Sequence, residues 1–92
     1  MIVSFADDDT EAVFSGKRVR RWAQLLTVAQ RKLQLLDSAA TLEALRVPPG
    51  NRLEALRGDR AGQHSIRIND QFRVCFVWAA DGVRDVQIVD YH

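Results

Sequence analysis

The sequence predicts an α+β fold, in which an N-terminal strand and two or three helices precede an antiparallel meander of three to four strands. Two patterns support this prediction. Between residues 20 and 36, apolar residues recur every three to four positions, which is typical of an amphipathic helix. Beyond residue 51, apolar and polar residues alternate, which is typical of half-buried strands. Helices followed by a run of short strands indicate a sheet with helices covering one face.

Four elements are expected in the first half of the chain. Residues 2–5 are rich in β-branched and aromatic side chains and form an opening strand. Residues 9–14 begin with acidic side chains and end before a glycine, as a short helix does. Residues 20–36 form the long amphipathic helix. A shorter helix spans residues 37–45, and the prolines and glycine that follow end it.

The second half is expected to be a meander. Its strands are residues 53–56, 64–68, 72–78 and 83–89. Asn69, Asp70 and Gln71 provide one turn, and Asp81 with Gly82 provides the next.

The register of these strands bears on function. A three-residue turn at 69–71 keeps the apolar residues on one face and places Arg67 opposite Arg73 on the other. Because like charges directly opposite each other are destabilising, this pairing indicates an anionic ligand, unless each arginine has its own carboxylate or extends into solvent. A two-residue turn at Asp81 and Gly82 would bring Asp90 beside Arg73, whereas a three-residue turn would move Asp90 to the other face.

Length and composition limit the class of protein. The chain has 92 residues, which fit a single domain spanning 1–92, and 47% of them are hydrophobic, as in a globular protein. A single cysteine, Cys75, excludes an intramolecular disulfide, which favours a cytoplasmic location. Charged residues interrupt every apolar run, and the N-terminal region turns acidic without a basic start. We therefore expect neither a membrane span nor a signal peptide.

The charges are unevenly distributed. Residues 1–15 contain four acidic and no basic residues, whereas residues 16–34 contain six basic and no acidic residues. The basic residues of that second block are Lys17, Arg18, Arg20, Arg21, Arg31 and Lys32. Arginine is well suited to binding phosphate. As a group these residues favour contacts with a polyanion, while any one of them could simply keep the helix surface soluble.

Metal and nucleotide-cofactor chemistry is disfavoured. Neither His64 nor His92 has a metal-ligand spacing with Cys75, and the sequence contains no phosphate-binding loop or nucleophile elbow. We therefore expect no metal and no cofactor. Cys75, in the middle of an expected inner strand, is interpreted as a small packed hydrophobe.

The sequence closes with Asp90, Tyr91 and His92, which offer acid, base and stacking groups. Together with Arg67, Arg73 and Arg57 they would meet the needs of RNA cleavage by its own 2′-hydroxyl. That reaction needs a base, cations for the phosphorane charge and an acid for the leaving oxygen. The alternative is that these residues form a structural tail, which the Tyr91 side chain anchors to the domain.

Several segments resemble the HigB toxins of the RelE/ParE superfamily, also known as plasmid maintenance killer proteins. The resemblance rests on residues 52–60, 65–76 and 89–92, and residues 2–5, 31–33 and 48–53 also resemble that family. It implies a toxin that cleaves mRNA in the A site of a translating 70S ribosome. It also implies a HigA-like helix-turn-helix antitoxin, with operator DNA bound only through the toxin–antitoxin complex.

The resemblance also implies roles for individual residues. Asp90, Tyr91 and His92 would act at the scissile phosphate, and Arg73 would stabilise its charge. Arg57 and Arg67 would bind phosphate, and Gln71 would lie near the RNA. The basic residues Lys17, Arg18, Arg20 and Arg21 would contact ribosomal RNA.

One position departs from the family pattern, since Glu54 stands where some relatives carry a catalytic histidine. Glu54 could serve as the base or could be a solvent-facing strand residue. Two other functions stay open: a ParE-like toxin that binds a protein target, and an inactive homologue that acts only as a co-repressor with its antitoxin.

Overall fold

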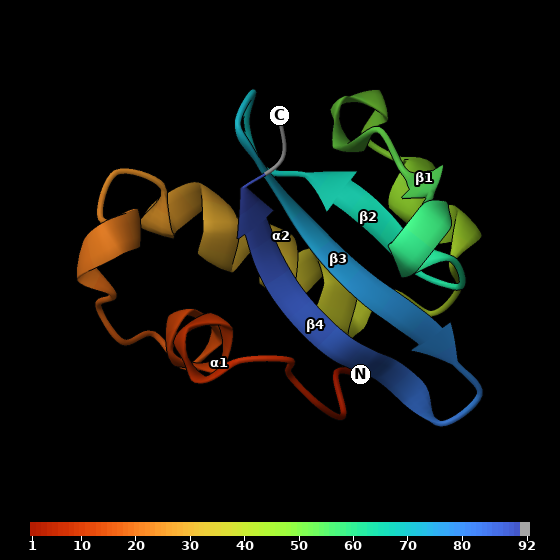
Figure 1. Ribbon diagram of the computed structural model, residues 1–92, viewed down its shortest axis with the longest axis horizontal. Helices are drawn as coiled ribbons and strands as arrows, with labels where there is room; N and C mark the ends of the chain where they lie inside the picture. The colour runs from red at the N-terminus through yellow and green to blue at the C-terminus, as the bar shows by residue number, and fades with distance from the viewer. Residues whose placement is uncertain (91–92) are drawn as a thin grey trace.

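The computed structural model describes residues 1–90 and confirms the expected α+β class (Figure 1). Four antiparallel strands form one sheet in the order β1-β2-β3-β4. The elements are α1 (Asp8–Phe14), α2 (Leu26–Ser38), β1 (Glu54–Ala55), β2 (His64–Arg67), β3 (Phe72–Ala79) and β4 (Gly82–Asp90). Short 3₁₀ turns lie at Arg20–Trp22, Glu43–Arg46, Pro49–Asn51 and Gly58–Arg60.

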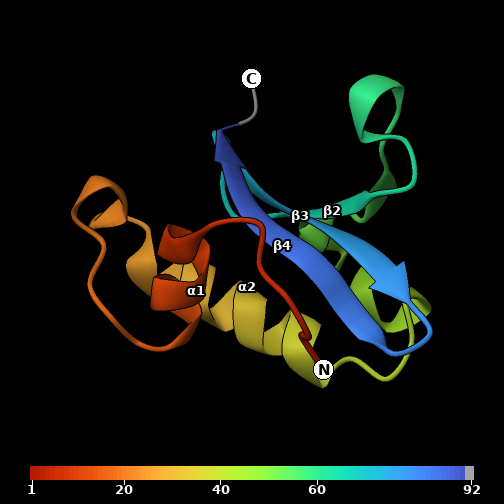
Figure 2. The ribbon, with the colours of Figure 1, turned by 60° about the horizontal axis from the view of Figure 1, so that its bottom comes forward.

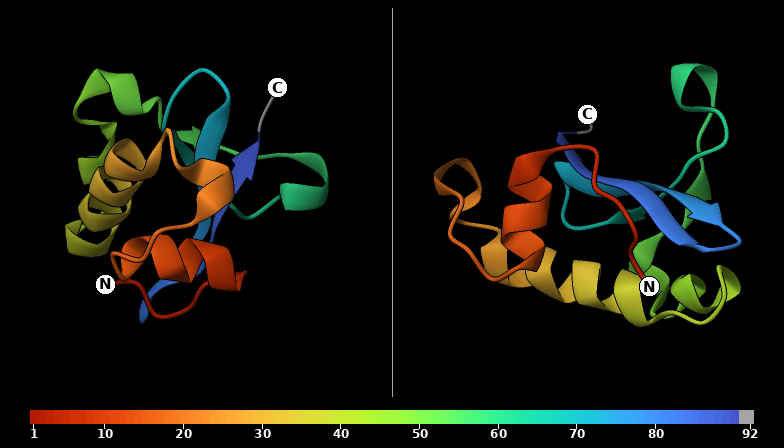
Figure 3. Two further views of the ribbon diagram at one scale, coloured as in Figure 1. Left: turned by 90° about the vertical axis from the view of Figure 1, so that its left-hand side faces the viewer. Right: turned by 90° about the horizontal axis from the view of Figure 1, so that it is seen from below.

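Both helices lie on one face of the sheet, while the Gly58–Arg60 turn projects on the other side (Figures 2 and 3). The core fills the space between α2 and the sheet. Its buried side chains include Val13, Trp22, Ala29, Leu33, Leu36, Leu45, Ile66, Val74, Phe76, Val83, Val86 and Ile88. The alternation seen in the sequence explains this arrangement, because every second residue of β2 and β3 points toward the helices.

The N-terminal segment is extended but forms no continuous strand, in contrast to the prediction for residues 2–5. It runs along the outer edge of β4 and pairs with it in parallel at two isolated bridges, Ile2 with Val83 and Phe5 with Val86. Between the bridges, Asp85 has a positive φ of 53°, and its N–H bonds to the Ser4 hydroxyl. This irregularity in β4 interrupts its pairing with the N-terminal segment, which is therefore limited to the two separate bridges.

The long helix begins later than predicted, at Leu26 instead of residue 20. Arg20 and Arg21 form a 3₁₀ turn with Trp22, and Leu25 has a non-helical backbone with no side-chain cap. Positive side chains are unfavourable at the N-terminus of an α-helix. The two arginines therefore favour a separate 3₁₀ turn and disfavour an α-helix that begins at residue 20.

The prediction of a second helix at residues 37–45 was wrong. Asp37 and Ser38 complete α2, and the Asp37 carboxylate accepts a hydrogen bond of 2.8 Å from the Ile2 N–H. Asp37 therefore ties the N-terminal segment to the end of α2 and does not start a new helix. Only a 3₁₀ turn, Glu43–Arg46, follows.

The register of β2 and β3 is the predicted one, with Ile66 opposite Val74 and Arg67 opposite Arg73. The pairing of Asp90 with Arg73 was wrong. The β3–β4 turn consists of Ala80 and Asp81, and not of the predicted Asp81 and Gly82, because Ala79 lies opposite Gly82. A bulge between Cys75 and Val77 then changes the register by one residue, so that Asp90 lies opposite Phe72 and Val89 lies opposite Arg73. Since successive strand residues alternate between faces, Asp90 is on the face of Phe72.

Thr10 connects α1 to the sheet. It is fully buried, and its hydroxyl accepts a 3.0 Å hydrogen bond from the Ile88 N–H of β4. The remainder of α1 is held at its start, where the Asp7 carboxylate caps the helix by accepting from the Thr10 N–H. Thr10 thus satisfies a buried backbone donor at the bulged strand.

Replacing Thr10 with valine keeps the shape of the side chain and removes this acceptor. We expect Thr10→Val to lower the free energy of unfolding by about 1–2 kcal/mol, because the buried Ile88 N–H loses its partner. Chemical denaturation measures the change. Thr27→Val, at an exposed position of α2, is the matched control and should change stability little. Equal effects of the two substitutions would contradict this role for Thr10.

Cys75 is fully buried in β3, and burial raises the pKa of its thiol despite the opposing effect of Arg60 and Arg73. This supports its interpretation as a packed hydrophobe. Because the thiol ionises first in the unfolded chain, its contribution to stability is complete below the ordinary pKa. That contribution is lost as pH rises through the ordinary pKa toward the raised value.

We therefore expect Ellman's reagent to label Cys75 at pH 8 only in denaturant, and the free energy of unfolding to fall as pH rises above about 9. Denaturation at several pH values measures the slope. In Cys75→Ala, the part of the decrease in the free energy of unfolding that comes from the thiol should be absent. Fast labelling of the folded protein would show that the thiol is accessible.

Candidate functional site

Three arginines from separate segments line a pocket of about 260 Å³ at one end of the sheet. Its lining residues are Arg52, Arg67, Asn69, Asp70 and Arg73, and we call it the arginine pocket. Arg67 and Arg73 lie together because the β2–β3 register makes them direct neighbours. Arg52 comes from the segment before β1. A concentration of guanidinium groups of this kind suits a phosphate or another anion.

Arg73 is the buried member of the pocket, with 9% of its surface exposed. Its Nε donates to the Ser65 hydroxyl at 2.8 Å, and its Nη2 donates to the Arg52 carbonyl at 2.5 Å. A buried guanidinium needs such partners, because an unsatisfied buried charge is costly. Arg73 therefore joins β3, β2 and the segment that carries Arg52.

Glu54 lies beside Arg73, as its Oε1 is 3.5 Å from the Arg73 Nη2. The carboxylate is half exposed, so it is accessible from solvent. On its other side, Glu54 lines a second pocket of about 380 Å³ with Ala55, Leu56 and Arg57. The structure therefore places Glu54 with the predicted site residues Arg73 and Arg57, on the short edge strand β1.

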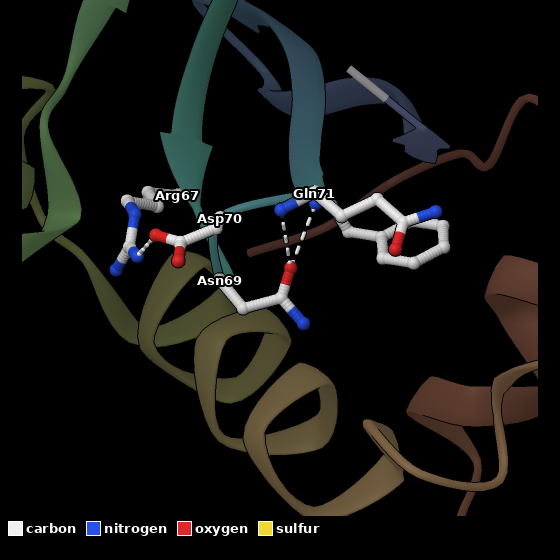
Figure 4. Close-up of polar contacts among 5 residues, drawn as sticks. Arg67, Asn69, Asp70 and Gln71 are labelled. Carbon is white, nitrogen blue, oxygen red and sulfur yellow. Dashed lines mark hydrogen bonds and ion pairs between the residues drawn. The ribbon is translucent and has the colours of Figure 1, made fainter. Parts of the chain in front are cut away.

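The β2–β3 turn forms one wall of the arginine pocket (Figure 4). The Asn69 side chain accepts hydrogen bonds from the N–H groups of Gln71 and Phe72, at 2.9 and 2.8 Å. These bonds fix the turn that the sequence predicted. Arg67 forms an ion pair with Asp70, whose carboxylate is fully exposed. Arg67 and Arg73 thus each have their own carboxylate, one of the arrangements that the sequence left open.

Arg52 was missed by the sequence analysis, although it is one of the three arginines of the pocket. Its backbone is left-handed, with a φ of 47°. The preceding residue, Asn51, is fully buried, and its amide donates to the carbonyls of Leu45 and Val47. The left-handed conformation, these local bonds and the bond from Arg73 of β3 to the Arg52 carbonyl hold Arg52 at the pocket, and none of them has a sequence pattern of its own.

Lys32 of α2 supports the same region. Its ammonium group donates a hydrogen bond to the Asn51 side chain. Burial, and then the nearby charges of Arg31 and Arg67, hold the pKa of Lys32 below its ordinary value.

Gln71 and Asp90 contact each other, with a 3.1 Å hydrogen bond from the Gln71 amide to the Asp90 carboxylate. Gln71 also lines a pocket of about 360 Å³ with Arg20 and Arg21. Arg20, Arg21 and Gln71 were each predicted to bind RNA. The fold brings these three residues together, although they come from distant parts of the sequence.

The remaining predicted residues lie elsewhere. Lys17 lines a pocket whose other residues are mostly acidic, among them Asp8, Asp9 and Glu11. Arg18 is exposed on the same segment. Tyr91 and His92 lie outside the described residues.

Within residues 1–90, no three histidine, cysteine, aspartate or glutamate side chains gather as a metal site would require. Over the same range, no helix has the length and apolar character needed to cross a membrane.

Structural similarity extends over nearly the whole chain. The YoeB–YefM complex from Staphylococcus aureus matches with a TM-score of 0.61 and 19% identity, over 100% of this chain and 95% of that one. The YoeB/ParE toxin from Agrobacterium tumefaciens matches with a TM-score of 0.56 and 22% identity, over 99% and 98% of the two chains. At these identities the similarity establishes the RelE-like fold.

Sequence similarity is more specific. Toxin HigB-1 of Vibrio cholerae is 48% identical over 62 residues, which make up 67% of this chain and 64% of that protein. An uncharacterised Haemophilus influenzae protein is 30% identical over 72% of this chain and 65% of its own length. The matches thus span slightly less than two thirds of these curated relatives. The family model for the RelE-like toxin HigB of type II toxin–antitoxin systems matches residues 3–92. The chain therefore belongs to the HigB-like family of RelE-like toxins.

Proposed function

We propose that this toxin is a ribosome-dependent, metal-independent mRNA endonuclease that cuts codons in the A site and thereby inhibits translation in the cytoplasm. The arginine pocket is the observation that carries this proposal. Arg52, Arg67 and Arg73 together line a cavity of about 260 Å³, which is wide enough for a phosphate group of the RNA backbone. The HigB family model supports the assignment to toxins.

In the proposed reaction, the 2′-hydroxyl of the RNA attacks the adjacent phosphate. Negative charge grows on the phosphate oxygens as the bond to the leaving 5′-oxygen breaks. Preorganised cations stabilise such charge best when they need no rearrangement. Arg73 meets this condition, because its bonds to Ser65 and Arg52 already fix its orientation. Arg52 and Arg67 would hold the phosphate from the open side.

Glu54 is the proposed base that accepts the proton of the attacking hydroxyl. Its carboxylate is half exposed and lies 3.5 Å from the Arg73 guanidinium, next to the phosphate in this scheme. His92 is proposed to protonate the leaving oxygen, with Tyr91 stacking on a base and Asp90 assisting. Arg57, in the pocket beyond Glu54, would contact the RNA on that side.

The partners follow from the family. We propose a helix-turn-helix antitoxin similar to HigA, with operator DNA bound through the complex of the two proteins. The S. aureus neighbour is itself a complex, of YoeB with YefM, which supports an antitoxin partner. The exposed basic residues Lys17, Arg18, Arg20 and Arg21 are available for phosphates of the ribosome or mRNA.

Primer extension on a defined mRNA, bound to ribosomes, tests the activity with purified, antitoxin-free protein. We expect a cut in the A-site codon that is absent from naked RNA. Arg67→Ala should slow the cut by about 10- to 100-fold, because one phosphate contact is lost. His92→Ala, tested as a separate single variant, should abolish most of the cleavage rate.

Arg84→Ala is the matched control, because Arg84 is also ion-paired at i,i+3 but lies at the opposite end of β3. It should cleave at the wild-type rate. Intact mRNA in every lane, from folded protein that still arrests growth, would exclude the nuclease and favour a ParE-like toxin that binds a protein. Intact mRNA without growth arrest would favour an inactive co-repressor.

Asp70 competes with phosphate for Arg67, since its carboxylate occupies the guanidinium at the mouth of the pocket. We expect Asp70→Asn to bind a short, uncleavable RNA about three- to fivefold more tightly at low salt, with the gain shrinking as salt rises. Fluorescence anisotropy at several salt concentrations measures this.

The control is Asp81→Asn, which frees Arg84 from a similar i,i+3 ion pair at the far end of β3. Both substitutions change the net charge by the same amount. Equal gains from both would mean that only total charge matters and that Asp70 has no special position.

A further inference from the structure

Another pocket, of about 360 Å³, lies between the 3₁₀ turn before α2 and the β2–β3 turn, which also lines the arginine pocket. Its lining side chains include Arg20, Arg21, Gln24, Leu25, Gln71 and Phe72, and we call it the flanking pocket. Its volume is within the range of pockets that hold small organic ligands. The two segments that form it are about 50 residues apart in the sequence, so only the fold creates it.

Both arginines of the flanking pocket are open to solvent, and Arg21 is also held in place. The Arg21 guanidinium lies 4.1 Å from the centre of the Trp22 ring, and its Nε is 3.2 Å from Asp9. These two contacts fix its orientation, while its side chain stays 60% exposed. Arg20 is exposed, and no carboxylate within residues 1–90 pairs with it. One oriented and one unpaired arginine therefore face the same cavity.

The rest of the lining is neither acidic nor strongly basic. Gln24 and Gln71 contribute amides, which can both donate and accept hydrogen bonds, as base edges require. Phe72, which is only partly buried, contributes apolar surface on which a planar ring can pack. The arginine pocket, by contrast, is lined by charged and amide groups alone. The flanking pocket thus combines features for a phosphate with features for a base.

The β2–β3 turn separates the two pockets. Asn69 and Asp70 line the arginine pocket, whereas Gln71 and Phe72 line the flanking pocket. In Figure 4, Arg67 and Asp70 lie on one side of the turn, and the Gln71 side chain extends from the other side, away from them. An RNA chain that crosses this turn would pass from one pocket to the other.

We propose that the flanking pocket binds the nucleotide next to the one whose phosphate occupies the arginine pocket, so that Arg20 and Arg21 contact the mRNA substrate itself and not ribosomal RNA. This inference rests on the proposed function. It separates Arg20 and Arg21 from Lys17 and Arg18, which belong to the same basic block but do not line the pocket.

Two fluorophore-labelled 2′-O-methyl probes that cannot be cleaved, a 5′-phosphorylated mononucleotide and a hexanucleotide, test the inference by fluorescence anisotropy. The mononucleotide has one phosphate for the arginine pocket and no neighbouring nucleotide, whereas the hexamer also reaches the flanking pocket. We expect Arg20→Ala/Arg21→Ala to weaken hexamer binding about fivefold and to leave mononucleotide binding unchanged. Arg67→Ala should weaken binding of both.

Arg46→Ala/Arg84→Ala is the matched control, because it removes two exposed arginines that line neither pocket. It should change hexamer binding by less than twofold. An equal loss with this control, or an unchanged hexamer affinity in Arg20→Ala/Arg21→Ala, would overturn the flanking pocket. If instead Arg67→Ala leaves mononucleotide binding unchanged, the proposed phosphate site fails, whatever the hexamer shows. A wild-type protein that binds neither probe would overturn both the phosphate site and the flanking pocket.

Discussion

The hydrogen-bonded guanidinium of Arg73 is the interaction on which the candidate site depends. It is buried in β3, and it contacts Ser65 of β2, the carbonyl of Arg52 and the carboxylate of Glu54. Those contacts offset the cost of burying a charge and fix the edge strand and the left-handed residue that precedes it. Without Arg73, both Arg52 and Glu54 would lose one of the contacts that hold them in place. The proposed charge-stabilising group is therefore also the structural centre of its own site.

A second constraint acts from the helical layer. The buried amide of Asn51 binds two backbone carbonyls, and Lys32 of α2 binds the Asn51 side chain. The segment that carries Arg52 is thus held by Arg73 on one side and by α2 on the other. Both restraints are polar and at least partly buried, so they specify one geometry where apolar packing would allow several. A rigid arrangement of this kind favours binding of a transition state over binding of a flexible substrate.

Much of the fold and part of the site could be predicted from the sequence. Alternating residues gave the meander and the Arg67–Arg73 pairing, since strand periodicity and a three-residue turn fix the register. The Asp90 pairing failed because the β3–β4 turn lies one residue earlier than predicted and because β4 carries a bulge, where Asp85 bonds to Ser4, 81 residues away. Arg52 was missed because its position depends on long-range bonds. Arg20, Arg21 and Gln71 were each predicted, but their shared pocket is a property of the tertiary structure.

The extended N-terminal segment has a consequence for assembly. Backbone hydrogen bonds from Val3 and Ala6 to β4 cover the outer edge of the sheet. Gly82 permits this close approach, since a Cβ there would lie 2.7 Å from the Met1 carbonyl oxygen. The opposite edge, β1, is only two residues long. Long open edges invite other chains to add strands, and here both edges are blunted. A partner protein therefore cannot extend this sheet beside β4 by β-augmentation unless it first displaces the toxin's own N-terminal residues.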